Sequence, residues 1–402
     1  MEEWKEYRLG ELCSISSSKR IFAEEYKSFG IPFYRGKEII EKQKGTNIST
    51  ELYISESRYE EIKNKFGVPQ KGDVLLTSVG TLGIPYIIKD ETFYFKDGNL
   101  TWFYNFNGIN SKFLYYWFLS PTGKNTIEVN AIGSTQKALT IDTLSKIRIN
   151  IPNFKIQNKI VAILSSLDEK IELNRRINGN LEQQAQALFK AWFVDFEPFK
   201  SGKFVDSELG KIPAGWKVVE LGKVTTQEKE KVGIRSDVKV LSPVTTGKLM
   251  LSEEYFTKQV FSDSIAKYIL VKPNSFAYNP ARVNIGSMGR NTFMFDGCVS
   301  PVYVVFSCEK EYHYFFDMYR QLPSFKEEVI ARSIGGVRQT LKYSDFALIR
   351  IAYPPQNIVL KFNDLYKRLL HAQDMYHTES ENLTEIRDLL LPRLMSGEIK
   401  MQ

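Results

Sequence analysis

The chain has 402 residues, a formal net charge of +7 at pH 7, 43% hydrophobic residues and 25% charged residues. This composition is ordinary for a globular protein long enough to form two or three domains, and the modest positive charge permits nucleic-acid binding without arguing for it. No stretch approaches the roughly 20 apolar residues of a membrane span, and the polar, acidic N-terminus does not look like a secretory signal. We therefore expect a cytoplasmic protein with no membrane partner. Three cysteines without a C-x-x-C pair, and only three histidines, give no zinc-site spacing.

The first predicted domain covers residues 1–152. Runs of β-branched and aromatic residues broken by turn signals predict strands at 74–77, 85–88 and 101–104. The nearly uniform apolar run at 113–119 predicts a buried helix. The pattern favours a mixed α/β globule.

A long amphipathic helix is predicted next, within residues 153–192. Its apolar residues recur every seven positions, with Ile163 and Ile177 in the complementary position of the heptad. The expected seam consists of Ile160, Leu167, Asn174, Leu181 and Leu188. A linker at 193–206 follows, indicated by proline, glycine and lysine between residues 197 and 203.

The second predicted domain, residues 207–354, repeats the order of the first. Trp216 followed by Leu221-Gly222 matches Trp4 followed by Leu9-Gly10. The segment 132–139 (IGSTQKAL) returns as 334–341 (IGGVRQTL), about 202 residues later, and Ile-Arg-Ile at 147–149 returns at 349–351. Such self-similarity predicts two similar halves related by a pseudo-two-fold axis, and suits a two-part target.

A second long helix is predicted within residues 355–402, in the same heptad phase as the first. Its seam is Phe362, Leu365, Leu369, Ala372, Tyr376, Leu383, Ile386 and Leu390. The fold class expected is therefore α+β: two similar globular domains separated by two long helices packed as an antiparallel coiled coil. Asn174 and Glu379 are polar residues in the seam, and Asn174 is interpreted as fixing the register. The alternative is that both helices only cover the globules.

Catalytic motifs are missing from the sequence. There is no G-x-x-x-x-G-K-[ST] phosphate loop and no glycine-rich dinucleotide or methyl-donor loop after a strand. Asn279-Pro280 resembles the start of the adenine-methyltransferase tetrapeptide, but Ala281 and Arg282 stand where a second proline and an aromatic ring are needed to stack a flipped base. We predict that the chain is not an enzyme.

Two kinds of loop are candidates for binding DNA. The loop after residue 278 offers amide, guanidinium and glycine together, and the repeated loops near 133 and 335 offer glycine, glutamine and a cation. The alternatives are tight structural turns, loops packed on their own domain and ordinary solvated charges. The full set of DNA-binding candidates is Lys19, Arg20, Arg35, Lys37, Ser78, Thr81, Ser134, Thr135, Gln136, Lys137, Asn279, Arg282, Asn284, Arg290, Arg332, Arg338 and Gln339.

Taken together, these features resemble the specificity subunit of Type I restriction–modification systems. The resemblance covers essentially the whole chain and is carried by the two Trp-x-x-x-x-Leu-Gly openings, Tyr-Asn-Pro-Ala-Arg at 278–282, the repeated glycine loop, Ile-Pro at 151–152 and the close of the second helix at 391–399. The first domain departs from the Tyr-Asn-Pro-x-Arg pattern, with Leu-Leu-Thr-Ser-Val at 75–79 instead. Its loop is therefore expected to contact DNA differently.

The resemblance implies a non-catalytic DNA reader whose two domains each bind half of a bipartite asymmetric site. It implies two methyltransferase subunits and two motor–nuclease subunits as partners, together with double-stranded DNA. S-adenosylmethionine, ATP and Mg²⁺ would belong to those partners, and no cofactor to this chain. A DNA-binding regulator acting alone and a purely structural adaptor are the alternative functions.

Overall fold

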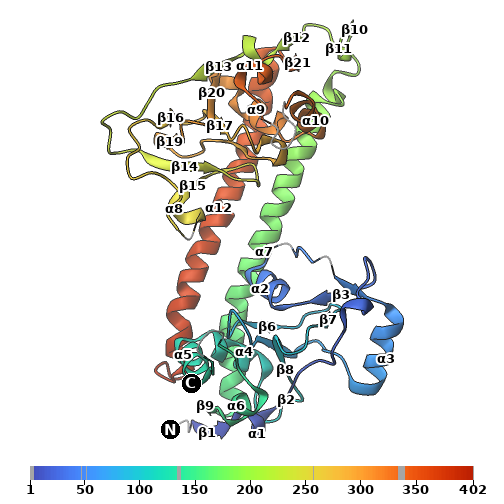
Figure 1. Cartoon of the computed structure of the whole chain (residues 1–402), viewed down its shortest axis with the longest axis vertical. Coiled ribbons are helices and arrows are strands. Elements are labelled where there is room, and N and C mark those ends of the chain that lie inside the picture. Colours follow the sequence, from blue (N-terminus) through green and yellow to red (C-terminus); the bar gives the residue numbers. More distant parts are fainter. Residues whose placement is uncertain are drawn as a thin grey trace. The chain divides into compact units, whose positions relative to one another are not determined.

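The computed structural model of the protein describes residues 4–46, 48–50, 52–133, 137–256, 258–333 and 340–401. The chain divides into two compact units, the first comprising Met1–Ile177 with Met375–Gln402 and the second comprising Asn178–Asp374. Each unit contains a β-rich globule together with part of α7 (Phe154–Phe193) and part of α12 (Gln356–Met395) (Figure 1).

In the first unit, a four-stranded antiparallel sheet has the order β2 (Ser14–Ser16), β8 (Leu100–Tyr104), β5 (Val74–Thr77), β6 (Pro85–Ile87). A smaller sheet has the order β4 (Tyr53–Ile54), β3 (Ile31–Tyr34), β7 (Tyr94–Phe95), with β3 and β7 parallel. β1 (Lys5–Arg8) pairs with β9 (Arg148–Ile151). The helices are α1 (Leu9–Leu12), η1 (Ala23–Glu25), α2 (Gly36–Lys44), α3 (Glu56–Phe66), α4 (Ser111–Leu119), α5 (Pro121–Asn130) and α6 (Ile141–Lys146).

The second unit repeats this plan. Its first sheet has the order β13 (Thr225–Glu228), β20 (Val304–Cys308), β17 (Phe276–Tyr278), β18 (Met288–Arg290), and its second the order β15 (Leu249–Leu251), β14 (Lys239–Pro243), β19 (Gly297–Val299), β16 (Ile269–Val271). β12 (Lys217–Glu220) pairs with β21 (Arg350–Tyr353), and β10 (Phe204–Ser207) forms a hairpin with β11 (Gly210–Pro213). The helices are η2 (Glu197–Phe199), η3 (Leu221–Lys223), α8 (Ser252–Tyr255), η4 (Val283–Ile285), η5 (Lys310–Tyr312), α9 (His313–Tyr319), α10 (Pro323–Arg332) and α11 (Tyr343–Phe346).

The predicted duplication is confirmed at the level of single strand pairs. In the first unit Leu75 pairs with Trp102, and in the second Ala277 pairs with Val305, which lie 202 and 203 residues further on. The loops after these strands repeat a backbone hydrogen bond as well. The N–H of Leu139 donates to the Ser78 carbonyl at 2.9 Å. The N–H of Leu341 donates to the Pro280 carbonyl at 3.1 Å.

Each globule buries the apolar stripe of both long helices. In the first unit, Ile160 and Leu164 of α7 and Leu394 of α12 join a core that includes most of α4. In the second, Phe189 of α7 and Phe362 of α12 join a core with α9 and α10. Burial of one such side chain contributes about 1.5–3 kcal/mol. The stripe therefore packs on the globule as well as on the neighbouring helix. Helix–helix packing and coverage of the globules, the two predicted roles of the long helices, are thus both present.

Within the first unit, the two helices run antiparallel. Arg387 of α12 donates to Asp168 of α7 at 2.9 Å, and Asn174 donates to Glu379 at 2.8 Å, so numbers rise along one helix as they fall along the other. The Asn174 side chain is fully buried, and its partner is the other polar residue of the predicted seam. A buried amide whose partner is available at one level of a helix pair penalises other registers.

The second unit has the same antiparallel pairing. Near its boundary, Gln373 donates to the Asn178 carbonyl at 3.3 Å, and further along α7 the ring of Phe189 meets Phe362 with a centroid separation of 5.7 Å. Antiparallel helix pairing is thus confirmed within each unit.

Most residues of the predicted seam are shielded from solvent. Buried or half-buried side chains are found at Ile160, Leu167, Asn174, Leu181, Leu188, Phe362, Leu369, Tyr376, Leu383 and Leu390. However, Ile163, Leu365 and Ile386 are 36%, 38% and 46% exposed, so their assignment to the seam is wrong. A straight helix of 3.6 residues per turn drifts away from a strict seven-residue repeat, and Tyr366 and Arg387 take the inward positions instead.

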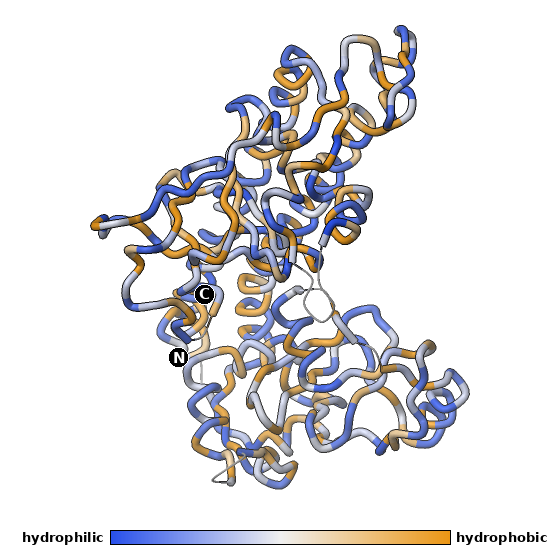
Figure 2. Tube along the Cα trace, turned by 45° about the horizontal axis from the view of Figure 1, so that its top comes forward, coloured by the Kyte–Doolittle hydropathy of each residue, from blue (hydrophilic) through white to orange (hydrophobic). Residues whose placement is uncertain are grey.

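Hydrophobic and hydrophilic residues alternate along the trace of both units (Figure 2). In the part of the chain that the structure describes, none of the helices combines the length and apolarity required to span a bilayer.

Candidate nucleic-acid interface

The loop between β17 and β18 is the best-defined candidate in the second unit. The Asn279 side-chain oxygen accepts from the Ala281 N–H at 3.0 Å, and the Arg282 N–H donates to the Asn279 carbonyl at 3.0 Å, so the segment closes into a tight turn. Val283 is buried beneath it. The turn is therefore held by the Asn279 side chain and by its own backbone, and Val283 anchors it to the core.

Gly286 ends the short η4 helix of this loop. Its φ is +93°, and a Cβ at this position would lie 2.8 Å from the Thr245 carbonyl oxygen. Both the backbone conformation and the close approach require glycine here.

Arg282 and Asn284 are presented by this rigid turn. The Arg282 side chain is exposed, and neither it nor the Asn284 amide makes a hydrogen bond or ion pair with another described side chain. A guanidinium on a rigid loop can bind a phosphate or the edge of a guanine, and an amide can pair with adenine. The structure leaves both side chains available to a ligand.

Arg290 is placed differently. It is 8% exposed, and its guanidinium donates to Asp317 at 2.9 Å and to the Asn274 side-chain oxygen at 2.6 Å. Arg320 donates to the other Asp317 oxygen at 2.6 Å. Burial alone would raise the pKa of Asp317, but the Arg320 and Arg290 guanidinium groups outweigh burial and leave the pKa below its ordinary value. The surroundings of Arg290 are those of a structural residue that holds β18 against α9.

The matching loop of the first unit is chemically unlike that of the second. Ser78 is 2% exposed, and its hydroxyl lies 2.5 Å from that of Thr101 and 3.2 Å from the Leu76 carbonyl. Thr81, a few residues later, is exposed. Ser78 is therefore committed to the interior, whereas Thr81 remains accessible to a ligand.

The other described candidates are mostly engaged in local contacts at the surface. The Lys19 ammonium lies 4.4 Å from the centre of the Phe66 ring. Arg35 pairs with the fully buried carboxylate of Glu38. Surface ion pairs are formed by Arg20 with Asp97, Lys37 with Glu41, Lys137 with Glu128 and Arg332 with Glu328. Exposed pairs are worth at most about 1 kcal/mol, so a phosphate can compete for the cations of the surface pairs. Ser134, Thr135, Gln136, Arg338 and Gln339 lie outside the described residues.

Sequence reasoning missed Asp317 and the interior position of Arg290. A signal was available in the repeat. In the second unit Arg290 pairs with Phe276, and at the equivalent place in the first unit Ile87 pairs with Val74. Arg290 is therefore the counterpart of Ile87. An apolar residue at the matching position indicates an inward-facing site. Among the described residues, no group of three or more His, Cys, Asp or Glu is arranged to hold a metal ion.

Comparisons with known proteins agree with this architecture. The family described as the Type I restriction modification DNA specificity domain matches residues 1–183. The Type I restriction enzyme MjaIX specificity subunit of Methanocaldococcus jannaschii is 28% identical over 425 aligned positions, which cover 100% of this chain and 94% of that protein. The HindI specificity subunit of Haemophilus influenzae is 26% identical, with 99% and 100% coverage.

Residues 1–183 therefore match the DNA specificity domain of this family, and the whole chain is similar to Type I restriction enzyme specificity subunits. A solved S subunit from M. genitalium has the same fold, with a TM-score of 0.57, 16% identity and coverage of 98% of this chain and 96% of that one. The similarity extends over both repeats, because the M. jannaschii and H. influenzae relatives align along the whole chain.

Proposed function

We propose that this chain is the DNA sequence-recognition subunit of a Type I restriction–modification system. Each repeat would read one half of a bipartite, asymmetric site, and the chemistry would be carried out by other subunits. The observation that carries this proposal is one scaffold built twice with different groups at the same place. Arg282 and Asn284 stand in one loop, where the equivalent loop has a buried Ser78 and an exposed Thr81.

Different groups on equivalent loops are what reading two unlike half-sites requires. Direct readout depends on which donors and acceptors reach the base edges, so a guanidinium and a hydroxyl in equivalent loops select different bases. Loop backbones fixed by repeated hydrogen bonds limit the entropy lost when DNA binds.

The proposed partners are two methyltransferase subunits and two motor–nuclease subunits, which would bring S-adenosylmethionine, ATP and Mg²⁺. Adenine methylation and cleavage would take place in those chains. Polar side chains on the long helices, including Arg175, Arg176, Lys367 and Arg368, would contribute to docking, and all four are exposed. The complex would act in the cytoplasm, where the host DNA is found.

Methylation mapping of the host genome, with and without this gene, tests the proposal. Deletion is expected to abolish methylation at one split adenine motif, and a copy carrying Arg282→Ala is expected to change or lose only the half of the motif read by the second repeat. An unchanged methylation pattern after deletion would rule the proposal out. Specific binding to DNA by the purified chain without any partner would favour a regulator that acts alone.

A further inference from the structure

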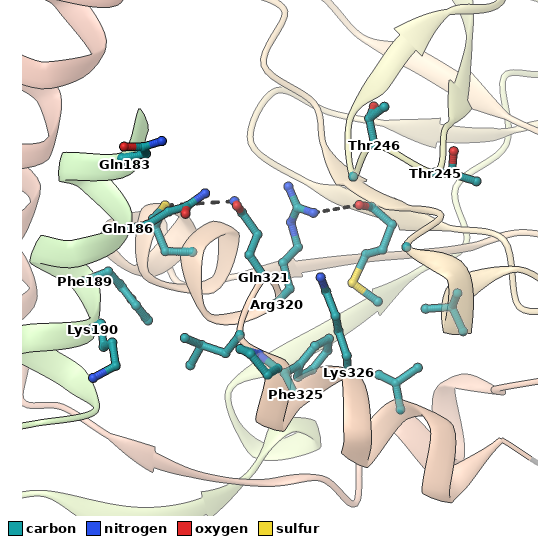
Figure 3. A pocket seen from close by; sticks show the side chains of 18 of the residues that line it. Gln183, Gln186, Phe189, Lys190, Thr245, Thr246, Arg320, Gln321, Phe325 and Lys326 are labelled. Carbon is teal, nitrogen blue, oxygen red and sulfur yellow. Dashed lines mark hydrogen bonds between the residues drawn. The ribbon is translucent and has the colours of Figure 1, made fainter. Parts of the chain in front are cut away.

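The second unit contains a cavity of about 550 Å³ between α7 and the recognition globule. Figure 3 shows Gln183, Gln186, Phe189 and Lys190 on the α7 side, facing Lys326 of α10 and the turn at Thr245 and Thr246. Such a volume accommodates a few amino-acid side chains or one small ligand.

The wall of the cavity includes the underside of the candidate DNA-contacting loop. Val283 and Gly286 line it, while Arg282, next to Val283, is exposed. A group that fills the cavity would therefore press on the loop that presents Arg282. A group packed against the buried Val283 side chain would restrict the movement of this loop.

The lining is cationic and has no carboxylate. Its charged residues are Lys190, Arg320 and Lys326. Lys190 is paired with Asp195 and Arg320 with Asp317, two carboxylates that are not part of the lining. The Lys326 ammonium has no partner among the described side chains, so one positive charge in the cavity is uncompensated.

The equivalent positions of the first repeat include two carboxylates. Moving 202 residues along the chain from Gln183 and Gln186 leads to Glu385 and Asp388 on α12. Lys326 corresponds to Lys124. The first repeat therefore has carboxylates, one of them paired with Arg387, where the second repeat has neutral amides, so a ligand with a carboxylate is better matched to the second repeat.

We propose that this cavity receives a protruding segment of a partner protein that combines an apolar side chain with a carboxylate, and that its insertion supports the Arg282 loop. The apolar side chain would pack on the buried ring of Phe189 and on the Val283 side chain, and the carboxylate would pair with Lys326. This inference rests on the proposed function, since the partner expected is a methyltransferase subunit.

A DNA phosphate is the competing occupant, and the shape and lining of the cavity argue against it. The ring of Phe189 and the Val283 and Met288 side chains contribute apolar surface that would desolvate a phosphate without compensation. A polypeptide side chain can satisfy both parts of the lining, as anchor residues do in protein–protein interfaces.

The test compares two matched charge reversals in the full-length chain, Lys326→Glu in the lining of the cavity and Lys124→Glu at the equivalent position of the first repeat, both at exposed lysines. Affinity for the host's purified methyltransferase subunit is measured by calorimetry, and a thermal melt of each variant checks folding. We expect Lys326→Glu to weaken binding at least about tenfold and Lys124→Glu to change it less than about twofold. Hydrogen exchange of residues 279–287 is expected to slow when the partner binds the wild-type chain.

Equal affinities for Lys326→Glu and wild type, or unchanged exchange of residues 279–287 on binding, would overturn this inference. The cavity would instead be assigned to a phosphate if Lys326→Glu kept its affinity for the methyltransferase but lost affinity for any DNA duplex. In that case the slope of log affinity for DNA against log salt concentration would be smaller in magnitude by about one. The proposed function is tested separately by methylation of a split site by the wild-type complex. If the wild-type complex methylates such a site while Lys326→Glu has no effect, only the cavity assignment fails.

Discussion

The two repeats share a backbone and differ in what they place on it. The hydrogen bond from Leu139 to Ser78 in one loop is matched by that from Leu341 to Pro280 in the other. On that common frame the first repeat turns a hydroxyl inward to Thr101, and the second turns a guanidinium outward at Arg282. A duplicated fold can therefore change its ligand through single side chains without altering its strand register.

The interiors beneath these loops differ as well. The second repeat has the buried Arg290–Asp317 ion pair where the first has Ile87 and Tyr115 at the equivalent positions. An ion pair and an apolar pair can fill similar space, but they respond differently to the loss of one partner. This difference is the basis of the two largest effects expected.

Replacement of Asp317 by alanine should destabilise the second unit by about 3–5 kcal/mol, because it leaves the Arg290 and Arg320 guanidinium groups buried without a counter-charge. Hydrogen exchange of the amides in β17 and β18 measures the local loss. The control is Glu328→Ala, which removes the partner of Arg332 from an exposed pair and should cost less than about 1 kcal/mol. Similar exchange rates in the two variants would contradict a structural role for the buried pair.

The same carboxylate predicts a pH dependence of stability. Since the folded protein lowers the pKa of Asp317, its contribution is complete above the unfolded-state pKa of about 4 and is lost as the pH falls through the lower folded-state value. The difference in stability between wild type and Asp317→Asn should therefore stay constant from pH 7 to pH 5 and shrink below about pH 4. The comparison is made by hydrogen exchange or denaturant titration at each pH. A difference that grows on acidification would have the wrong sign for a depressed pKa.

Substitutions in the two equivalent loops should affect DNA affinity differently. We expect Arg282→Ala to cost the assembled complex about 1–3 kcal/mol of specific affinity, since an exposed guanidinium is lost from a rigid turn. Ser78→Ala, at the equivalent loop, should leave DNA affinity unchanged because its hydroxyl is buried against Thr101. Fluorescence anisotropy with a duplex carrying the methylated motif measures both. A loss of affinity for Ser78→Ala in a normally folded protein would mean that the first loop rearranges on DNA.

Local patterns in the sequence predicted much of this architecture. The strands at 74–77 and 101–104 and the helix at 113–119 follow from short apolar runs between turn signals, and the two long helices follow from heptad spacing. The direction in which Ser78 and Arg290 point depends instead on partners 23 and 27 residues away, Thr101 and Asp317, which local patterns do not specify. For the same reason the drift of the helical stripe at Leu365 and Ile386 became visible only in the packed structure.

The smallest expected loss of stability follows from removing the Tyr116 hydroxyl in the first unit. Its hydroxyl donates to Asp168 at 2.7 Å, and the other oxygen of Asp168 accepts from Arg387 at 2.9 Å, so α4, α7 and α12 are joined through one carboxylate. The position 202 residues later is Met318, which has no hydroxyl. Tyr116→Phe should therefore cost only about 1 kcal/mol, since Asp168 keeps Arg387 and its partly exposed side chain can take up a water molecule.

Exchange of the α4 amides, residues 111–119, measures this cost, with Met318→Leu as the volume-preserving control in the second unit. That control should change the exchange of α9 by less than about 1.5 kcal/mol, because no polar group is lost. A penalty for Tyr116→Phe as large as that for Asp317→Ala would show that the hydroxyl, and not Arg387, is the main stabiliser of Asp168. The contrast between an ionic interior in one repeat and an apolar interior in the other would then no longer hold, because both repeats would depend on a buried polar network of similar strength.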